Sequence, residues 1–146
     1  MAARPEARIV ASDVDQRAVA CAKANGVEAY LGDLFEPLPS SLQGRAEVVV
    51  GVVPYVPTTE LPLLQRDTFT FESTLSYDGG PDGADVLRRV LAESPRWLRP
   101  GGALLLELGG GQADLLADDL ARLGYVDIRV LVDEEGDVRG IEATLV

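Results

Sequence analysis

The run of residues 47–53 constrains the fold of this chain more than any other feature. It reads Glu-Val-Val-Val-Gly-Val-Val, so it holds five valines and shows no polar alternation. β-Branched residues favour strands, and a strand without alternation is typical of one buried on both faces. Because parallel sheets covered by helices bury their strands in this way, we expect a central parallel strand and an α/β fold.

The segments around this run alternate between strand and helix patterns. Strands are predicted at residues 8–12, 28–31 and 103–108, and helical patterns at residues 16–25, 82–98 and 112–123. Residues 99–102, Arg-Pro-Gly-Gly, are predicted to form a turn. Two last strands, 125–132 and 138–145, flank the acidic turn 133–137, which is too short for a helical crossover and therefore predicts an antiparallel hairpin.

Composition narrows the classes of partner and site. The 146 residues suit one domain with a core, and 13 basic against 24 acidic residues give a net charge of -11, which disfavours nucleic acid and anionic lipid. A protein or small-molecule partner fits better.

Histidine is absent and Cys21 is the only cysteine, so we expect no disulfide and no metal site, and a buried Cys21. No apolar run approaches the ~20 residues of a membrane span and no signal pattern begins the chain, so we expect no membrane contact and a cytoplasmic location.

Three groups of residues with chemical potential follow predicted strands. Asp13 ends the first strand, where an acidic side chain can accept both hydroxyls of a ribose, while Asp15 is placed to cap the next helix. Asp33 and Leu34 follow the second strand and could contact an adenine ring. The Pro-aromatic turn in residues 52–57 follows the valine run and could form a pocket wall. Taken singly, each also reads as an ordinary loop carboxylate or as chain punctuation.

Taken together, these segments resemble successive blocks of the HemK/PrmC-type glutamine methyltransferases, a class I family that uses S-adenosylmethionine. The resemblance covers nearly all of residues 7–146. Its most specific block is Asp-Gly-Gly-Pro-Asp-Gly at residues 78–83. The other blocks are residues 11–15, 32–35, 52–57 and 97–102.

The resemblance implies roles for particular residues. Asp13 would hold the cofactor ribose, and Asp33 and Leu34 would flank its adenine. The substrate-binding Asn-Pro-Pro-Tyr motif of the family is matched by the four residues Val52, Val53, Pro54 and Tyr55. In that motif the Asn side chain and a backbone carbonyl grip the side-chain amide of a glutamine in a protein substrate such as a translation release factor. The implied activity is N-methylation of that amide, which depends mostly on positioning and electrostatics.

Two departures from the family pattern stand out. Val52 occupies the Asn position, and a valine side chain cannot accept an amide N–H bond. The resemblance also places a strand and a Gly-x-Gly-x-Gly loop before residues 2–10, whereas the chain begins at Met1. We therefore expect one partial methyltransferase domain over residues 1–146: a Rossmann-like, mostly parallel sheet with a C-terminal antiparallel hairpin, lacking the first strand and the glycine loop.

The missing strand would leave the strands at 8–12 and 47–53 with exposed aliphatic edges, through which copies of the chain could associate. Two alternatives to an active methyltransferase follow from the sequence. One is an inactive remnant that serves as a binding or interaction module. The other is a nucleotide-binding protein that uses Gly109–Gly111, although the resemblance places a structural Glu-x-Gly-x-x-Gln turn there, outside the cofactor pocket. The acidic turn 133–137 is interpreted as a solvated hairpin tip instead of a metal loop.

Overall fold

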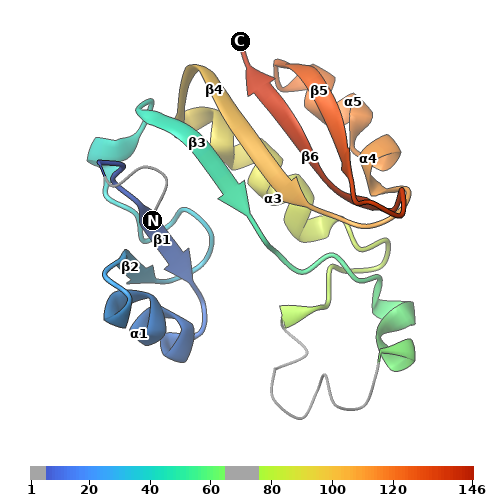
Figure 1. Ribbon diagram of the computed structural model, residues 1–146, viewed down its shortest axis with the longest axis horizontal. Helices are drawn as coiled ribbons and strands as arrows, with labels where there is room; N and C mark the ends of the chain where they lie inside the picture. The colour runs from blue at the N-terminus through green and yellow to red at the C-terminus, as the bar shows by residue number, and fades with distance from the viewer. Residues whose placement is uncertain (1–5, 65–75) are drawn as a thin grey trace. The chain divides into compact units, whose positions relative to one another are not determined.

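Two β-sheets, one of two strands and one of four, form the framework of the chain in the computed structural model, which describes residues 6–64 and 76–146 (Figure 1). The sheets belong to two compact units, Met1–Leu42 and Gln43–Val146. Each unit is described by itself below. The single partial domain expected over the whole chain stays a prediction.

The first unit is a β-α-β crossover. Strand β1 (Val10–Asp13) pairs in parallel with β2 (Glu28–Leu31), and helix α1 (Gln16–Ala24) connects them; the 3₁₀ helix η1 (Ser40–Leu42) ends the unit. Helix α1 begins as predicted, because the Asp15 carboxylate accepts the Arg17 N–H at 2.7 Å. The prediction that Cys21 is buried is wrong. Val19 is the buried residue of α1, and a residue two positions later points away from that face.

The second unit holds a four-stranded sheet in the order β3-β4-β6-β5. Its strands are β3 (Ala46–Gly51), β4 (Leu98–Glu107), β5 (Tyr125–Val132) and β6 (Val138–Leu145). Strand β3 pairs with β4 in parallel, and β6 is antiparallel to both β4 and β5, so three strands run one way and β6 runs against them. The predicted C-terminal hairpin is confirmed at both of its strands.

Strand β4 begins earlier than the sequence pattern suggests. Helix α3 (Asp85–Glu93) buries Leu87, Val90 and Leu91, and the short 3₁₀ helix η4 (Ser94–Arg96) ends the helical stretch. Residues 99–102, predicted as a turn, lie inside β4, where the pairing with β3 shifts register between Ala46 and Val48. A bulge of this kind lets a strand absorb a Pro-Gly-Gly sequence without ending.

The helix predicted at residues 112–123 is divided into two short ones, α4 (Gln112–Leu115) and α5 (Ala117–Arg122). Leu116 lies between them and is fully buried. Its N–H still bonds the Gln112 carbonyl at 3.0 Å, and its carbonyl accepts the Leu120 N–H at 3.0 Å. The change is therefore local to one residue, and the two short helices continue in the same direction.

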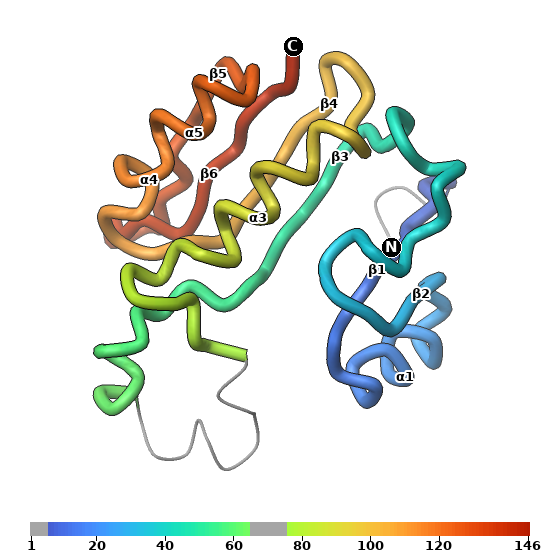
Figure 2. Tube along the Cα trace, turned by 180° about the vertical axis from the view of Figure 1, so that it is seen from behind, coloured from blue at the N-terminus to red at the C-terminus, as the bar shows by residue number. Residues whose placement is uncertain are grey.

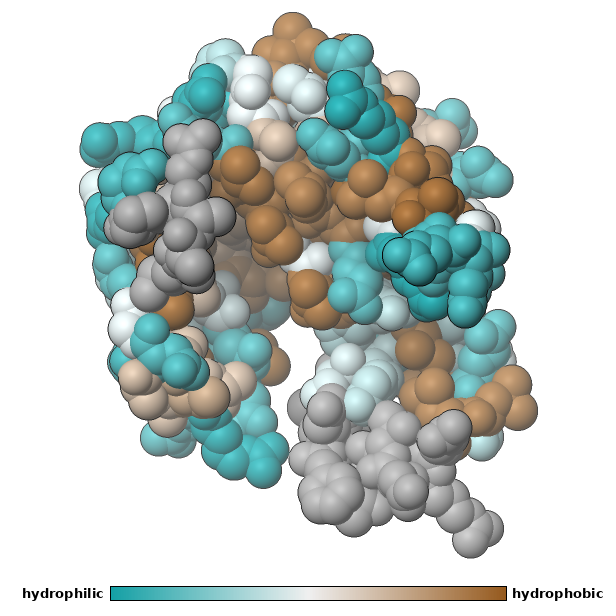
Figure 3. Space-filling model, in the orientation of Figure 1, coloured by the Kyte–Doolittle hydropathy of each residue, from teal (hydrophilic) through white to brown (hydrophobic). Residues whose placement is uncertain are grey.

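Helices α3, α4 and α5 cover only one face of the four-stranded sheet, as Figures 1 and 2 show. Gly51 points to this face, because a Cβ placed on it would meet Val90 of α3 at 3.8 Å. Side chains alternate along a strand, so Val48 and Val50 point to the opposite face, where they are 53% and 67% exposed. Figure 3 shows an apolar surface on that face.

The prediction that the valine run is buried on both faces is therefore wrong. Strand β3 is the terminal strand of its sheet, and the described helices of the second unit lie on the other face, away from its outward valines. In the part of the chain that the structure describes, β1 pairs only with β2 and β3 only with β4, which agrees with the expectation that each lacks a neighbour on one side. Among residues 6–64 and 76–146, no helix has the length and the apolar character needed to cross a membrane.

Candidate functional site

The predicted cofactor residues lie together at the carboxyl ends of β1 and β2. The Gly32 N–H donates to the Asp13 carbonyl at 3.0 Å, which places the start of the second loop beside the end of β1. The Ser12 hydroxyl donates to the Leu34 carbonyl, and Leu34 adopts a left-handed backbone with φ of 44°. Asp13 is exposed, and one of its carboxylate oxygens accepts the Asp15 N–H at 2.7 Å. This arrangement offers a carboxylate next to an apolar turn.

The predicted substrate residues form the turn that follows β3 in the second unit. Val52 is 73% exposed, whereas Val53, Pro54 and Tyr55 are half-buried. Just beyond the turn, the Val56 N–H donates to the Tyr77 carbonyl at 2.9 Å, and the Val56 carbonyl accepts the Gly79 N–H at 2.8 Å. The chain after β3 is thus tied to Tyr77 and to the Asp-Gly-Gly-Pro-Asp-Gly block that follows it.

The Asp78 side chain extends this connection. Its carboxylate accepts the Thr58 hydroxyl at 2.7 Å and the Gly80 N–H at 3.0 Å. These hydrogen bonds, with that from Thr58 the stronger, hold the pKa of the Asp78 carboxyl below its usual value of 3.8 because they favour the ionised form. Asp78, the first residue of the Asp-Gly-Gly-Pro-Asp-Gly block, therefore links this block to the segment that follows β3.

Two glycines of the block permit close contact with the turn. A Cβ on Gly79 would lie 2.8 Å from the Tyr55 Cα, and one on Gly83 would lie 2.4 Å from the Tyr55 carbonyl oxygen. Gly83 also has a φ of +75°, a left-handed conformation that glycine adopts without steric cost. The sequence of the block is thus explained by its packing against the turn.

Asp82 attaches the same block to the helices. Its carboxylate accepts the Ala84 N–H at 3.0 Å, just before α3, and forms an ion pair with Arg88 at 2.7 Å. Arg88 also lies 3.7 Å from the Asp119 carboxylate on α5. The Arg88 hydrogen bond, followed by that from Ala84, lowers the pKa of Asp82 below its usual 3.8.

Gln112 joins three backbone segments at this site. Its side-chain Nε2 donates to the Tyr55 carbonyl at 2.7 Å and to the Gly83 carbonyl at 3.0 Å, while its Oε1 accepts the Gly109 N–H at 2.9 Å. The Gly109 N–H donates to Gln112, and α4 has only four residues, so the glycine turn does not lead into a long helix of the kind that follows a phosphate loop. The structural interpretation of Gly109–Gly111 stays a prediction.

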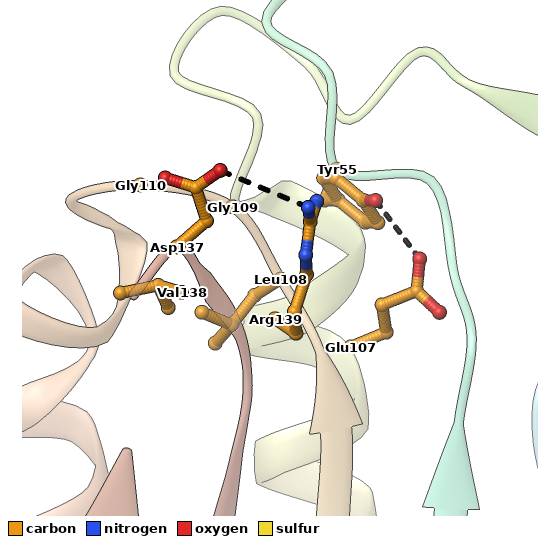
Figure 4. Close-up of a pocket in the computed structure, with 8 residues that line it drawn as sticks. All are labelled: Tyr55, Glu107, Leu108, Gly109, Gly110, Asp137, Val138 and Arg139. Atoms are coloured by element: carbon orange, nitrogen blue, oxygen red, sulfur yellow. Dashed lines mark hydrogen bonds and ion pairs between the residues drawn. The ribbon is translucent and has the colours of Figure 1, made fainter. Parts of the chain in front are cut away.

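Tyr55 lines an open pocket of about 450 Å³ in the second unit, and Figure 4 shows the residues around this pocket. The Tyr55 hydroxyl donates to the Glu107 carboxylate at 2.9 Å, and burial, followed by this bond to Glu107, raises the pKa of Tyr55 above 10.0. Arg139 lies across from the ring and pairs with Asp137 at 3.8 Å. The pocket is lined by Tyr55, Glu107, Leu108, Gly109, Gly110, Asp137, Val138 and Arg139.

The acidic turn between β5 and β6 is organised by its own hydrogen bonds. One Asp133 oxygen accepts the N–H groups of Glu135 and Asp137 at 3.0 and 2.9 Å, and the other pairs with Arg139 at 2.6 Å. Three of its carboxylates, those of Asp133, Glu135 and Asp137, approach within 4.8 Å of one another. Because Asp133 is engaged by the turn itself, the interpretation as a hairpin tip fits this geometry.

Comparison with known proteins gives the family context. No family model matches the chain. A release factor glutamine methyltransferase of Geobacter sulfurreducens is 35% identical over 138 residues, which are 90% of this chain and 48% of that protein. One from Synechocystis is 35% identical over 135 residues, covering 86% of this chain and 45% of that protein.

The chain is a relative of the release factor glutamine methyltransferases. The predicted resemblance to the HemK/PrmC type is thereby confirmed. The chain spans about half the length of these curated relatives.

Solved structures confirm that this chain has the class I methyltransferase fold. A chain of the E. cuniculi Mtq2–Trm112 complex, which is responsible for methylation of the eRF1 translation termination factor, gives a TM-score of 0.60 at 24% identity, covering 95% of this chain and 73% of that one. The antibiotic-resistance methyltransferase Kmr gives 0.51 at 20% identity, covering 99% and 78%. At such identities the likeness concerns the fold alone.

The roles of two residues of the site, Glu107 and Gln112, were not predicted from the sequence. The bond from Tyr55 to Glu107 joins positions 52 residues apart, and no local pattern reveals it. Gln112 was placed in a structural turn, but its contacts with Tyr55 and Gly83 were not anticipated. The available signals were the Glu-x-Gly-x-x-Gln turn, which contains both Glu107 and Gln112, and a polar side chain at the start of a helix.

Proposed function

We propose that this chain is part of an S-adenosylmethionine-dependent methyltransferase that N-methylates the side-chain amide of a glutamine in a protein, with a translation release factor as the substrate class. One observation carries the proposal. The turn of Val53, Pro54 and Tyr55 follows β3 directly, and its end is anchored by the hydrogen bonds that Val56 forms with Tyr77 and Gly79 and by the one that Gln112 donates to the Tyr55 carbonyl. The names of the relatives, which share 35% identity with this chain, support the same activity.

The residues of the first unit fit part of the cofactor. The exposed Asp13 carboxylate suits a ribose diol, and the Leu34 turn beside it, with Asp33, suits an adenine ring. The β1–α1 turn at residues 13–16 contains no glycine, so it offers no Gly-x-Gly loop for the rest of the cofactor. When bound, S-adenosylmethionine supplies an electrophilic sulfonium methyl group.

The turn after β3 would present the substrate amide. Because the Tyr55 carbonyl is already bonded to Gln112, the carbonyl that accepts an amide N–H would be that of Val53 or Pro54. A fixed carbonyl orients the amide nitrogen, and this positioning is the main contribution that a protein makes to such a transfer. Val52 adds no second acceptor, so we expect the grip to be weaker than that of an Asn by about 1 kcal/mol.

A second candidate is a binding or interaction module without catalysis. The observation that favours it is the exposed Val52, which puts an apolar side chain at the first position of the substrate motif. In this case the turn would bind a protein segment and transfer no methyl group.

Two measurements test the proposal. Calorimetric titration with S-adenosylhomocysteine should give a dissociation constant in the micromolar range, and Asp13→Ala should weaken it. Incubation with methyl-labelled S-adenosylmethionine and a capped peptide with one glutamine should transfer one label to that glutamine, whereas the matched glutamate peptide should stay unlabelled. Binding of the cofactor product without any transfer would favour the interaction module, and no binding at high micromolar concentration would refute the enzyme.

A further inference from the structure

The Gln112 side chain is only 9% exposed, and every polar group on it is used. The two Nε2 protons point to the Tyr55 and Gly83 carbonyls, and Oε1 faces the Gly109 N–H. The orientation of the amide is therefore determined, because a flipped amide would put its oxygen against two carbonyl oxygens. A primary amide suits this place since it combines two donors with one acceptor.

The three partners come from loops that are far apart in sequence. Tyr55 follows β3, Gly83 precedes α3, and Gly109 follows β4; Tyr55 and Gln112 are 57 positions apart in the sequence. A Cβ on Gly83 would lie 2.6 Å from Nε2, so the glycine leaves the space in which the amide sits. The Gln112 amide thus occupies the junction of three loops at the carboxyl edge of the sheet.

We infer that Gln112 is a positioning residue for substrate binding at the turn after β3. By bonding the Tyr55 carbonyl, it sets the direction of that peptide group and leaves the preceding carbonyls, of Val53 and Pro54, free to face a substrate amide. This inference rests on the proposed function for the identity of the ligand. The hydrogen bonds that carry it do not depend on that function.

Two variants and one control test the inference. Gln112→Glu keeps the size and the acceptor for Gly109 but opposes a carboxylate to two carbonyls, and Gln112→Leu removes all three bonds. Tyr125→Phe is the matched control, because it removes the buried 2.6 Å bond between Tyr125 and Ser94 in the same unit without touching the turn. Comparable melting temperatures for Gln112→Leu and the control would show that any difference between them is local.

The first measurement is amide hydrogen exchange by NMR. We expect the Val56 and Gly79 amides to exchange at least tenfold faster in both Gln112 variants and at the wild-type rate in Tyr125→Phe. In the wild-type chain the Gln112 Nε2 protons themselves should exchange slowly, a result that needs no variant to fold. Unchanged Val56 exchange, or equally faster exchange at Leu104 in the sheet, would overturn the positioning role.

The second measurement separates positioning from general stability. The capped glutamine peptide should bind at least fivefold more weakly to Gln112→Leu, while the dissociation constant of S-adenosylhomocysteine stays the same and Tyr125→Phe changes neither. The inference would be refuted if Gln112→Leu weakened the binding of the peptide and of S-adenosylhomocysteine equally. It would also be refuted if the variant weakened neither. If the wild-type chain does not bind the peptide, the proposed function fails, and the exchange measurement alone decides whether Gln112 fixes the turn.

Discussion

Replacement of Gly83 by alanine is the sharpest test of how the Asp-Gly-Gly-Pro-Asp-Gly block works. The new Cβ would lie 2.4 Å from the Tyr55 carbonyl oxygen, 2.6 Å from the Gln112 Nε2 and 3.0 Å from the Pro57 Cδ. The left-handed backbone at φ +75° costs an alanine about 1 kcal/mol. Overpacking against these atoms costs about 2 kcal/mol more, so Gly83→Ala should lower the free energy of unfolding by about 3 kcal/mol.

Gly136 provides a matched control for the overpacking contribution to the destabilisation by Gly83→Ala. Gly136 has a φ of +88°, and a Cβ on it would meet nothing within 4 Å. Gly136→Ala should therefore lower the free energy of unfolding only by the backbone cost of about 1 kcal/mol. Urea unfolding followed by the fluorescence of Trp97, the only tryptophan and a buried one, would report on the second unit in both variants. At this chain length the difference of about 2 kcal/mol corresponds to a gap of roughly 6 °C in melting temperature.

Equal destabilisation by the two substitutions would refute the reasoning. Such a result would mean that the loops around Gly83 can move apart to accept a methyl group. The turn at Tyr55 would then not be held rigidly, and the observation that carries the proposed function would be lost. A loss for Gly83→Ala that clearly exceeds the Gly136→Ala loss supports close packing of the block on the turn.

Three further outcomes are expected. Val52→Asn should bind the glutamine peptide about fivefold more tightly in calorimetry, because it adds a hydrogen bond of about 1 kcal/mol; an unchanged affinity would contradict its place in the motif. Asp13→Ala should weaken S-adenosylhomocysteine binding about tenfold, as expected for a lost charged acceptor of about 1.5 kcal/mol, while the melting temperature barely changes. Folding lowers the pKa of Asp82 below its usual value of 3.8. The ionised Asp82 side chain therefore contributes fully to stability above pH 3.8, and this contribution is lost as the pH falls through the lowered pKa. Asp82→Asn should therefore reduce the acid-dependent part of unfolding monitored between pH 5 and about 2, and an unaltered pH profile would argue against the Arg88 pair.

Local patterns were sufficient for much of the fold. The hairpin strands were predicted at their observed bounds because two strand patterns flank an acidic turn too short for a helical crossover, a signal contained within about twenty residues. The Asp15 cap was predicted for the same reason, since its partner is only two residues away. In contrast, the valines of β3 were assigned to a buried strand although Val48 and Val50 are exposed. Composition indicates that a strand can be buried, but the neighbours that would cover it lie elsewhere in the chain.

The sequence by itself determined the order of the strand and helix segments, the family blocks and the position of the turn at Pro54 and Tyr55, because each depends on residues close together in the chain. Only the tertiary structure decided that β6 inserts between β4 and β5, and that one face of β3 is left open. It also decided the role of Gln112, whose bonds reach 29 and 57 residues back along the chain. Such contacts depend on how the loops meet at the edge of the sheet, and they leave no periodic signal in the sequence.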